Sequence, residues 1–184
     1  NFRRARYSAN REGIAIWYLL SCREQEERKT IESCKDFFSD TALLDAFVLT
    51  YDRMCRYGGT WHMEKKLIFP ANVLLESENE TALRAELKKH KGVVGGVGQM
   101  WTILKINPEE EKLLKFLYGT KKHIGMSRGV IRKGVTKVTE GPLKGMEAQI
   151  YKIDRHKRLA RLRTPTGQNT RYIPAGLEIV EKSV

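Results

Sequence analysis

Apolar residues divide the first part of the chain into segments with two different spacings. Residues 14–20 are apolar throughout, and a short run of this kind that is rich in β-formers is typical of a buried strand. Residues 24–38 instead place Ile31, Cys34 and Phe38 on one stripe, with glutamate and lysine side chains one turn apart. The pattern predicts a strand followed by an amphipathic helix.

A hairpin is the next predicted feature. Residues 43–54 alternate loosely between apolar and polar side chains, and residues 61–67 form a second segment of the same kind. Between them, residues 56–60 read Arg-Tyr-Gly-Gly-Thr, which is a strong turn signal. Pro70 cannot donate to a ladder and marks a strand end, after which residues 73–75 begin another buried strand.

Two further helices and a change of character follow. Leu83 and Leu87 predict a helix over residues 81–90. Asn107-Pro108 followed by three glutamates predicts the start of another helix, which ends at Gly119. Residues 119–128 contain two glycines and no clear period, which predicts a linker. Beyond it, residues 130–184 are strand-like with evenly spaced glycine and proline turns, which is typical of a small β-barrel.

The positive charge is concentrated in this last segment. The whole chain has a net charge of +12, but residues 14–127 hold 17 Lys/Arg against 16 Asp/Glu. Residues 128–184 hold 13 against 5, a net of +8, and residues 1–13 hold 4 against 1. This asymmetry favours a polyanion partner such as nucleic acid, although a basic protein with no such partner is the alternative.

No recognisable catalytic or metal-binding motif accompanies that charge. The three cysteines (Cys22, Cys34 and Cys55) contain no C-x-x-C pair, so reduced thiols in a cytoplasmic protein are expected and a zinc site is not. The glycines of residues 92–98 follow a helix and lack a Lys-Ser/Thr ending, which predicts a plain connection rather than a phosphate loop. The four histidines are scattered (His62, His90, His123 and His156). We therefore predict no enzyme activity, no metal and no cofactor.

Membrane association is not predicted either, because no apolar run approaches the roughly 18 residues needed to span a bilayer. No signal-peptide pattern follows the arginine-rich start. Residues 1–13 are predicted to be a basic extension. Their FRRAR stretch is compatible with a nucleic-acid contact or with a translated leader.

Basic side chains of the C-terminal segment are the candidate nucleic-acid contacts. In residues 159–163, strict alternation puts Arg161 and Arg163 on one face and Ala160 and Leu162 on the other. A tyrosine such as Tyr151 or Tyr172 can stack on an unpaired base nearby. The alternative is an edge strand whose basic residues only prevent aggregation. The candidate contacts are Lys144, Lys152, Arg155, His156, Lys157, Arg158, Arg161, Arg163 and Arg171.

Four stretches of the chain resemble the NusG family of transcription elongation factors. Trp17-Tyr18-Leu19-Leu20 is similar to the opening strand of the family's N-terminal NGN domain, and Phe69-Pro70 before residues 73–75 is similar to its F-P-G-Y-V strand. The glycine loop before Asn107-Pro108-Glu109 resembles the end of NGN. Residues 137–147 resemble the KOW motif, and this is the most specific of the four stretches.

The resemblance implies an α+β fold: an NGN domain with a mainly antiparallel sheet, followed by a small SH3-like KOW β-barrel. The implied division is 1–13 extension, 14–118 NGN, 119–128 linker and 129–184 KOW. Within the family, the KIDRHKR segment and the LEIV ending are most similar to the specialised LoaP paralogues. That likeness implies processive antitermination through a structured leader RNA.

By the same resemblance, NGN docks on the clamp helices of RNA polymerase. The implied contact residues are Trp17, Tyr18, Ser21, Phe69, Pro70, Asn72 and Leu74. The chain has Ala71-Asn72 where Gly-Tyr is usual, so the implied pocket is less aromatic. One alternative is a general elongation factor whose KOW domain contacts ribosomal protein S10 or Rho, and another is a KOW-containing structural RNA-binding protein. We expect a monomer in each case.

Overall fold

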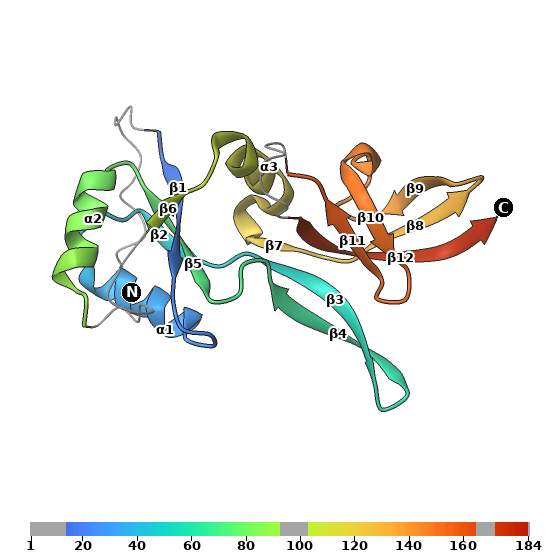
Figure 1. Ribbon diagram of the computed structural model, residues 1–184, viewed down its shortest axis with the longest axis horizontal. Coiled ribbons are helices and arrows are strands. Elements are labelled where there is room, and N and C mark those ends of the chain that lie inside the picture. Colours follow the sequence, from blue (N-terminus) through green and yellow to red (C-terminus); the bar gives the residue numbers. More distant parts are fainter. Residues whose placement is uncertain (1–13, 93–102, 165–171, 184) are drawn as a thin grey trace.

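The computed structural model describes residues 14–92, 103–164 and 172–183 of the chain, and Figure 1 shows their arrangement. These residues form an α+β structure with three α-helices and three mainly antiparallel sheets, which confirms the predicted fold class. None of these helices is long and apolar enough to cross a membrane. The basic extension, residues 1–13, lies outside the described residues, as does the glycine-rich stretch apart from Gly92.

The N-terminal sheet has four strands in the order β2-β5-β1-β6, and three helices pack around it. Every pairing within this sheet is antiparallel. Its elements are β1 Ile16–Ser21, α1 Glu27–Phe37, β2 Asp45–Phe47, β5 Asn72–Ser77, α2 Glu80–Lys89, β6 Ile103–Lys105 and α3 Pro108–Tyr118.

Strand β1 is apolar from Ile16 to Leu20 because both of its faces are covered there. Trp17 and Leu19 point into one buried cluster, which includes residues of α3, while Tyr18 and Leu20 point into another that includes residues of α1 and α2. Alternate side chains of a strand lie on opposite faces, so a continuous apolar run is what a sheet between two helical layers requires.

Glu111 of α3 has a structural role that its place in a glutamate run does not reveal. Its Oε2 accepts a hydrogen bond from the backbone N–H of Trp17 at 3.1 Å, and its Oε1 lies 2.6 Å from Lys115 Nζ. The helix begins with Asn107, whose side chain accepts from the N–H of Glu109. The carboxylate therefore ties the last helix to the first strand, while Asn107 caps its start.

The second sheet is a long hairpin with one added strand. It consists of β3 Thr50–Tyr57, β4 Thr60–Leu67 and β7 His123–Ile124 in the order β4-β3-β7, and β7 runs parallel to β3. The predicted strand 43–54 is thus two strands, because β2 joins the first sheet and β3 leaves it for the hairpin. The Gly58-Gly59 turn is where the sequence predicts it.

The C-terminal sheet follows the order β10-β11-β12-β8-β9 and curls into a small barrel. Residues of both edge strands, β9 and β10, line one cleft of about 470 Å³. Strand β12 runs parallel to β8, and the remaining pairs are antiparallel. The elements are β8 Ser127–Arg132, β9 Val135–Glu140, η2 Glu147–Gln149, β10 Ile150–Asp154, β11 Leu159–Leu162 and β12 Ile173–Ser183.

The predicted linker, residues 119–128, carries secondary structure that its composition does not reveal. It contains η1 Gly119–Lys121, β7 and the beginning of β8, and the side chain of Ile124 is buried. Lys122 adopts a left-handed backbone conformation, with φ of 53°, and its ammonium lies 3.8 Å from the centre of the Phe47 ring. Local propensity is weak here, and the partners that order the segment come from β2 and β3.

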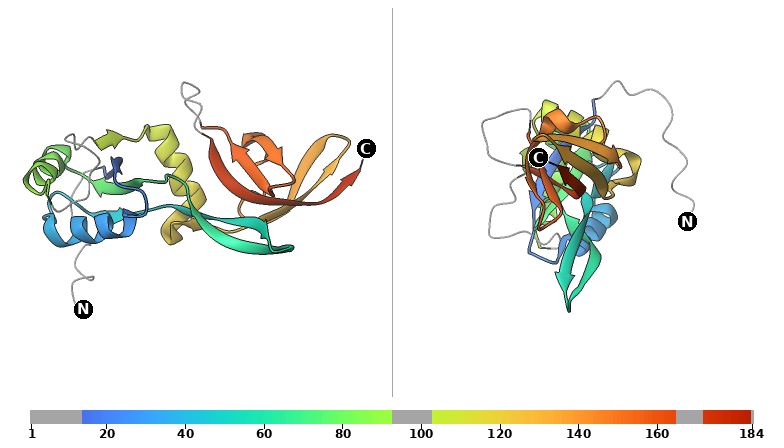
Figure 2. Two further views of the ribbon diagram at one scale, coloured as in Figure 1. Left: turned by 60° about the horizontal axis from the view of Figure 1, so that its bottom comes forward. Right: turned by 90° about the vertical axis from the view of Figure 1, so that its right-hand side faces the viewer.

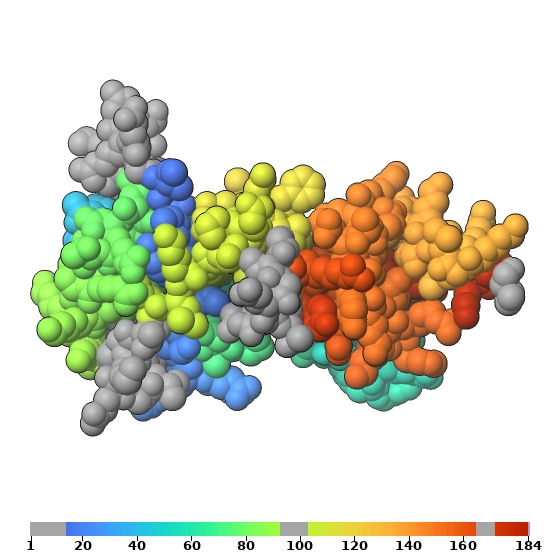
Figure 3. Space-filling view, turned by 45° about the horizontal axis from the view of Figure 1, so that its top comes forward, coloured from blue at the N-terminus to red at the C-terminus, as the bar shows by residue number. Residues whose placement is uncertain are grey.

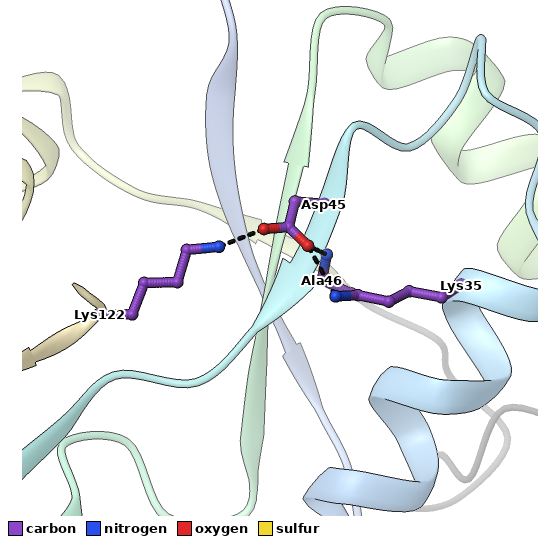
Figure 4. A network of polar contacts seen from close by, with 4 residues as sticks. All are labelled: Lys35, Asp45, Ala46 and Lys122. Atoms are coloured by element: carbon purple, nitrogen blue, oxygen red, sulfur yellow. Dashed lines mark hydrogen bonds and ion pairs between the residues drawn. The ribbon is translucent and has the colours of Figure 1, made fainter. Parts of the chain in front are cut away.

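Asp45 joins this segment to the N-terminal sheet and helix (Figure 4). Its carboxylate accepts a hydrogen bond from Lys122 Nζ and lies 2.8 Å from Lys35 Nζ of α1. Burial opposes ionisation of Asp45, but the hydrogen bonds from the two lysines outweigh it, so the pKa of Asp45 is lower than usual. A carboxyl group whose pKa is depressed on folding stabilises the folded state above its unfolded pKa of about 4 and loses that effect at lower pH.

We predict that Asp45→Asn lowers the free energy of unfolding by about 1–3 kcal/mol at neutral pH, because both lysines lose a charged acceptor. The difference from wild type should shrink as pH falls below about 4. Urea denaturation followed by far-UV circular dichroism measures both effects. Asp36→Asn is the control, since Asp36 is exposed on α1 and none of the described residues forms an ion pair with it. A constant difference across pH would contradict the assignment.

The barrel packs directly against the N-terminal part of the molecule. One continuous buried cluster includes Tyr51 of β3, Ile124 of β7 and Leu177 of β12. Figure 2 shows α3 between the first sheet and the barrel, with the β3–β4 hairpin running along the barrel. The division at residues 118 and 129 remains a prediction, because the apolar cluster crosses it.

Candidate nucleic-acid interface

Strands β10 and β11 present basic side chains on one face of the barrel. Lys152 and Arg161 are register partners, and both are exposed. Ala160 and Leu162 point inward and are buried, so the predicted alternation in β11 is confirmed. Residues that face each other on paired strands have neighbouring side chains, so Lys152 and Arg161 form one positive patch.

A pair of tyrosines lies beside this patch. Tyr151, at an irregularity in the β10–β11 register, stacks on Tyr172 with ring centroids 4.8 Å apart and an angle of 11° between the planes. The guanidinium carbon of Arg163 is 5.5 Å from the centre of the Tyr151 ring. Tyr151 remains 51% exposed. The structure therefore combines an aromatic surface with adjacent cations, the arrangement that binds unpaired bases and their phosphates.

The turn between β10 and β11 is held by hydrogen bonds among its own residues. Asp154 Oδ1 accepts a hydrogen bond from the N–H of Lys157 at 3.0 Å, and Arg158 N–H donates to the carbonyl of Arg155 at 3.3 Å. The hydrogen bond from the Lys157 N–H holds the pKa of Asp154 below its usual value. Arg155, His156 and Lys157 are exposed on this turn.

Arg158 differs from its neighbours because its charge is already engaged. The guanidinium carbon lies 3.9 Å from the centre of the Trp61 ring, and Nη1 is 2.9 Å from Glu178 Oε1. Its side chain is only 24% exposed. Arg158 thus holds the turn against the β3–β4 hairpin, and its contact with nucleic acid stays a prediction.

Two further predicted nucleic-acid contacts, Lys144 and Arg171, are not seen to join this patch. Lys144 is exposed on the turn after β9, where its N–H donates to the carbonyl of Gly141 at 3.1 Å. Arg171 lies outside the described residues. The structure therefore brings together Lys152, Arg161, Arg163 and the tyrosine pair, and places Lys144 on a separate turn.

Three of the predicted polymerase contacts are core residues. Trp17, Tyr18 and Leu74 are 5%, 2% and 1% exposed, and they lie on both faces of the N-terminal sheet. An approaching protein cannot reach these side chains in this arrangement of the chain. Their apolar character is explained by the core that they fill.

The other four predicted polymerase contacts lie near the end of β1 and the start of β5. Ser21 Oγ donates to Asn72 Oδ1 at 3.0 Å, and Asn72 Nδ2 donates to the Pro70 carbonyl at 2.8 Å. Phe69 is partly buried against the core. Ala71 between them has φ of 57°, and its N–H donates to Glu27 Oε1 at 2.8 Å. These residues form a small surface in which the hydrogen-bonded pair Ser21–Asn72 lies beside the exposed Pro70.

The histidines lie apart on separate elements of the described structure. His123 bridges Thr50 and Asp52 within the hairpin sheet, and His90 lies 3.1 Å from Glu86 on α2. His62 stacks on Tyr57. Among the described residues, no group of three or more His, Cys, Asp or Glu side chains is placed to hold a metal ion.

Two residues of the β3–β4 hairpin lie at the candidate interface, although the sequence does not predict them there. The Trp61 ring contacts the guanidinium group of Arg158, and Arg56 is the register partner of Trp61 across the hairpin. Both lie in a different predicted domain from the barrel. No spacing in the sequence connects them to residues 155–158, because the contact depends on how the barrel packs.

Comparison with known proteins gives one kind of match. No family model matches the chain, and no curated protein matches it. Solved structures do, among them one from work on domain interaction in Thermotoga maritima NusG. It is 16% identical, with a TM-score of 0.46, and the match covers 90% of this chain and 94% of that chain. A likeness of this size does not decide family membership.

Proposed function

We propose that the chain is a specialised NusG-type transcription elongation factor that promotes processive antitermination. Its N-terminal domain binds RNA polymerase, and its basic barrel binds a structured leader RNA. The observation that carries the proposal is the stacked pair Tyr151–Tyr172 beside Arg163, on the same face as Lys152 and Arg161. The charge balance of residues 128–184 supports it, with 13 Lys/Arg against 5 Asp/Glu.

The chemistry of this face suits single-stranded segments of RNA. Bases that are unpaired in a loop or bulge stack on tyrosine rings, and arginine guanidinium groups bind the adjacent phosphates with two parallel hydrogen bonds. A paired A-form stem shows its bases poorly to side chains, so the tyrosine pair favours a loop or bulge within the leader. Polymerase binding rests on the exposed Ser21–Asn72 surface and on the family resemblance of the sequence.

We predict that Tyr151→Ala weakens binding of the leader transcript by about 5- to 150-fold, since stacking of one base contributes ~1–3 kcal/mol. The salt dependence should hardly change, because no charge is removed. Fluorescence anisotropy with the labelled leader RNA of the operon that holds the gene measures both quantities. Read-through of a terminator placed after that leader, in transcription with purified polymerase, should fall in parallel.

Tyr57→Ala is the matched control for this substitution. Tyr57 is 54% exposed and stacks on His62, as Tyr151 stacks on Tyr172, but it lies at the tip of the β3–β4 hairpin. Its loss should leave RNA affinity unchanged. Equal RNA affinity of wild type and Tyr151→Ala would contradict the proposed stacking site. If the protein bound S10 and did not bind RNA, the result would instead support a general elongation factor. Failure to bind polymerase clamp helices would favour a structural RNA-binding protein.

A further inference from the structure

A cleft lies at the seam between the β3–β4 hairpin and the barrel. Its volume is about 410 Å³. The space-filling view shows the β3–β4 hairpin directly against the β10–β11 region of the barrel (Figure 3). Both parts of the chain line the cleft, through Arg56, Trp61, Arg155, His156, Arg158, Glu178 and Ile179.

Arg56 reaches this cleft because of the hairpin register. It stands directly opposite Trp61, and directly opposite residues of an antiparallel pair project from the same face. Trp61 in turn carries the guanidinium of Arg158 on its ring. The cation–π contact therefore places the β10–β11 turn, with Arg155 and His156, next to Arg56.

Positive charge exceeds negative charge in the cleft. Glu178 is the one carboxylate among the described residues of its lining, and it is shared by Arg158 at 2.9 Å and Arg128 at 3.4 Å. Within the described residues, no carboxylate oxygen lies within 4.0 Å of the Arg56 or Arg155 guanidinium nitrogens. Arg56 and Arg155 thus line the same cleft, and neither forms an ion pair with a carboxylate of the described residues.

We propose that this cleft binds a phosphodiester group of the nucleic-acid backbone, held jointly by Arg56 from the hairpin and Arg155 from the barrel. The proposal rests on the proposed RNA binding and extends it to the N-terminal part of the chain. Guanidinium groups match phosphate oxygens in a two-pronged geometry, and arginine is more weakly hydrated than lysine. The indole of Trp61 makes one wall apolar, which strengthens the attraction between the charges.

The cleft also couples RNA binding to the arrangement of the molecule. It exists only while the barrel is packed against the hairpin, so a ligand that bridges it binds this arrangement and no other. Such a ligand shifts the population toward the packed form by its difference in affinity. RNA binding and packing of the barrel on the hairpin therefore reinforce each other.

The test compares wild type with Arg56→Ala, Arg155→Ala and the double variant in one anisotropy assay, alongside Tyr151→Ala and a control variant. The probe is a fluorescein-labelled oligouridine, because phosphate contacts do not depend on base sequence. Each single arginine substitution should weaken RNA binding by about 3- to 10-fold and reduce the slope of log affinity against log salt concentration by about 1. The double variant should lose less than the product of the two single losses, because both arginines bind one phosphate.

Lys65→Ala is the matched control. Lys65 is exposed on β4 of the same hairpin and carries one positive charge, but it does not line the cleft. Its affinity and salt slope should equal those of wild type. Arg56 is exposed, and thermal melts of each variant verify that the fold is retained.

Three results would contradict the proposal in different ways. If Arg56→Ala binds RNA as Lys65→Ala does, while Tyr151→Ala and Arg155→Ala both bind more weakly, the bridging cleft is overturned. The proposed function then still stands. If Tyr151→Ala and Arg155→Ala also bind RNA as tightly as wild type does, RNA recognition by the barrel is contradicted. The cleft proposal, which rests on it, is then contradicted too. Multiplicative losses in the double variant assign the two arginines to separate phosphates and also contradict the proposal.

Discussion

Replacement of Gly141 with alanine is expected to destabilise the barrel strongly, through backbone strain and steric overlap together. Gly141 has φ of +92°, where side chains are strained, and an added Cβ would lie 2.6 Å from the Met126 carbonyl oxygen and 2.7 Å from Ser127 Cα. Both atoms are backbone and cannot move away cheaply. Backbone strain of about 1–3 kcal/mol and overlap of about 1–3 kcal/mol together predict a loss of ~2–6 kcal/mol.

Gly145 in the same loop separates the two causes of that loss. Its φ is +83°, but an added Cβ would meet no atom within 4 Å. Gly145→Ala should therefore cost only the backbone strain, about 1–3 kcal/mol. Denaturant unfolding of both variants measures the difference. Equal losses would mean that the contact with residues 126 and 127 contributes nothing, contrary to the tight turn seen in the structure.

Gly176→Ala is expected to loosen the barrel from the β3–β4 hairpin. An added Cβ would lie 2.5 Å from the carbonyl oxygen of Asp52 and even closer to the Met126 sulfur. The methionine can move, but the Asp52 oxygen belongs to the backbone of β3. Overpacking at such a site costs about 1–3 kcal/mol, and here separation of the two parts relieves it. We expect a larger radius of gyration in small-angle X-ray scattering and lower stability.

Gly125 supplies the control at the same seam. A Cβ added there would meet Asp52 Oδ2 at 3.7 Å, an ordinary van der Waals distance. Gly125→Ala should keep the scattering curve and the stability of wild type. Gly176→Ala should also lose the contribution of Arg56 to RNA binding, because the cleft opens. A Gly176→Ala protein with wild-type dimensions would show that the seam absorbs the methyl group by local shifts.

Most of the secondary structure could be predicted from short-range patterns. The apolar run of β1, the Gly58-Gly59 turn and the Asn107-Pro108 helix start each depend on residues close together in the chain. Such signals reflect backbone geometry and capping, which act over a few residues. Composition does not reveal the secondary structure of residues 119–128, where Lys122 and Ile124 are ordered by Asp45 and by the core.

The candidate site shows the same limit more sharply. Alternation alone placed Arg161 and Arg163 on one face, and the composition alone placed the excess charge in the barrel. Trp17, Tyr18 and Leu74 are buried, and the sequence does not reveal it, since apolar side chains of a strand show the same pattern whether they fill a core or bind a partner.

Local sequence patterns were enough to predict the three helices, the first strand, the hairpin turn, the basic character of the last segment and the shared face of Arg161 and Arg163. The folded molecule was needed to see that Tyr151 stacks on Tyr172, that Arg158 is held by Trp61 and Glu178, and that Arg56 lines the same cleft as Arg158. The reason is physical. Periodicity and turn chemistry are local, whereas these contacts arise from packing between segments that are distant in the chain.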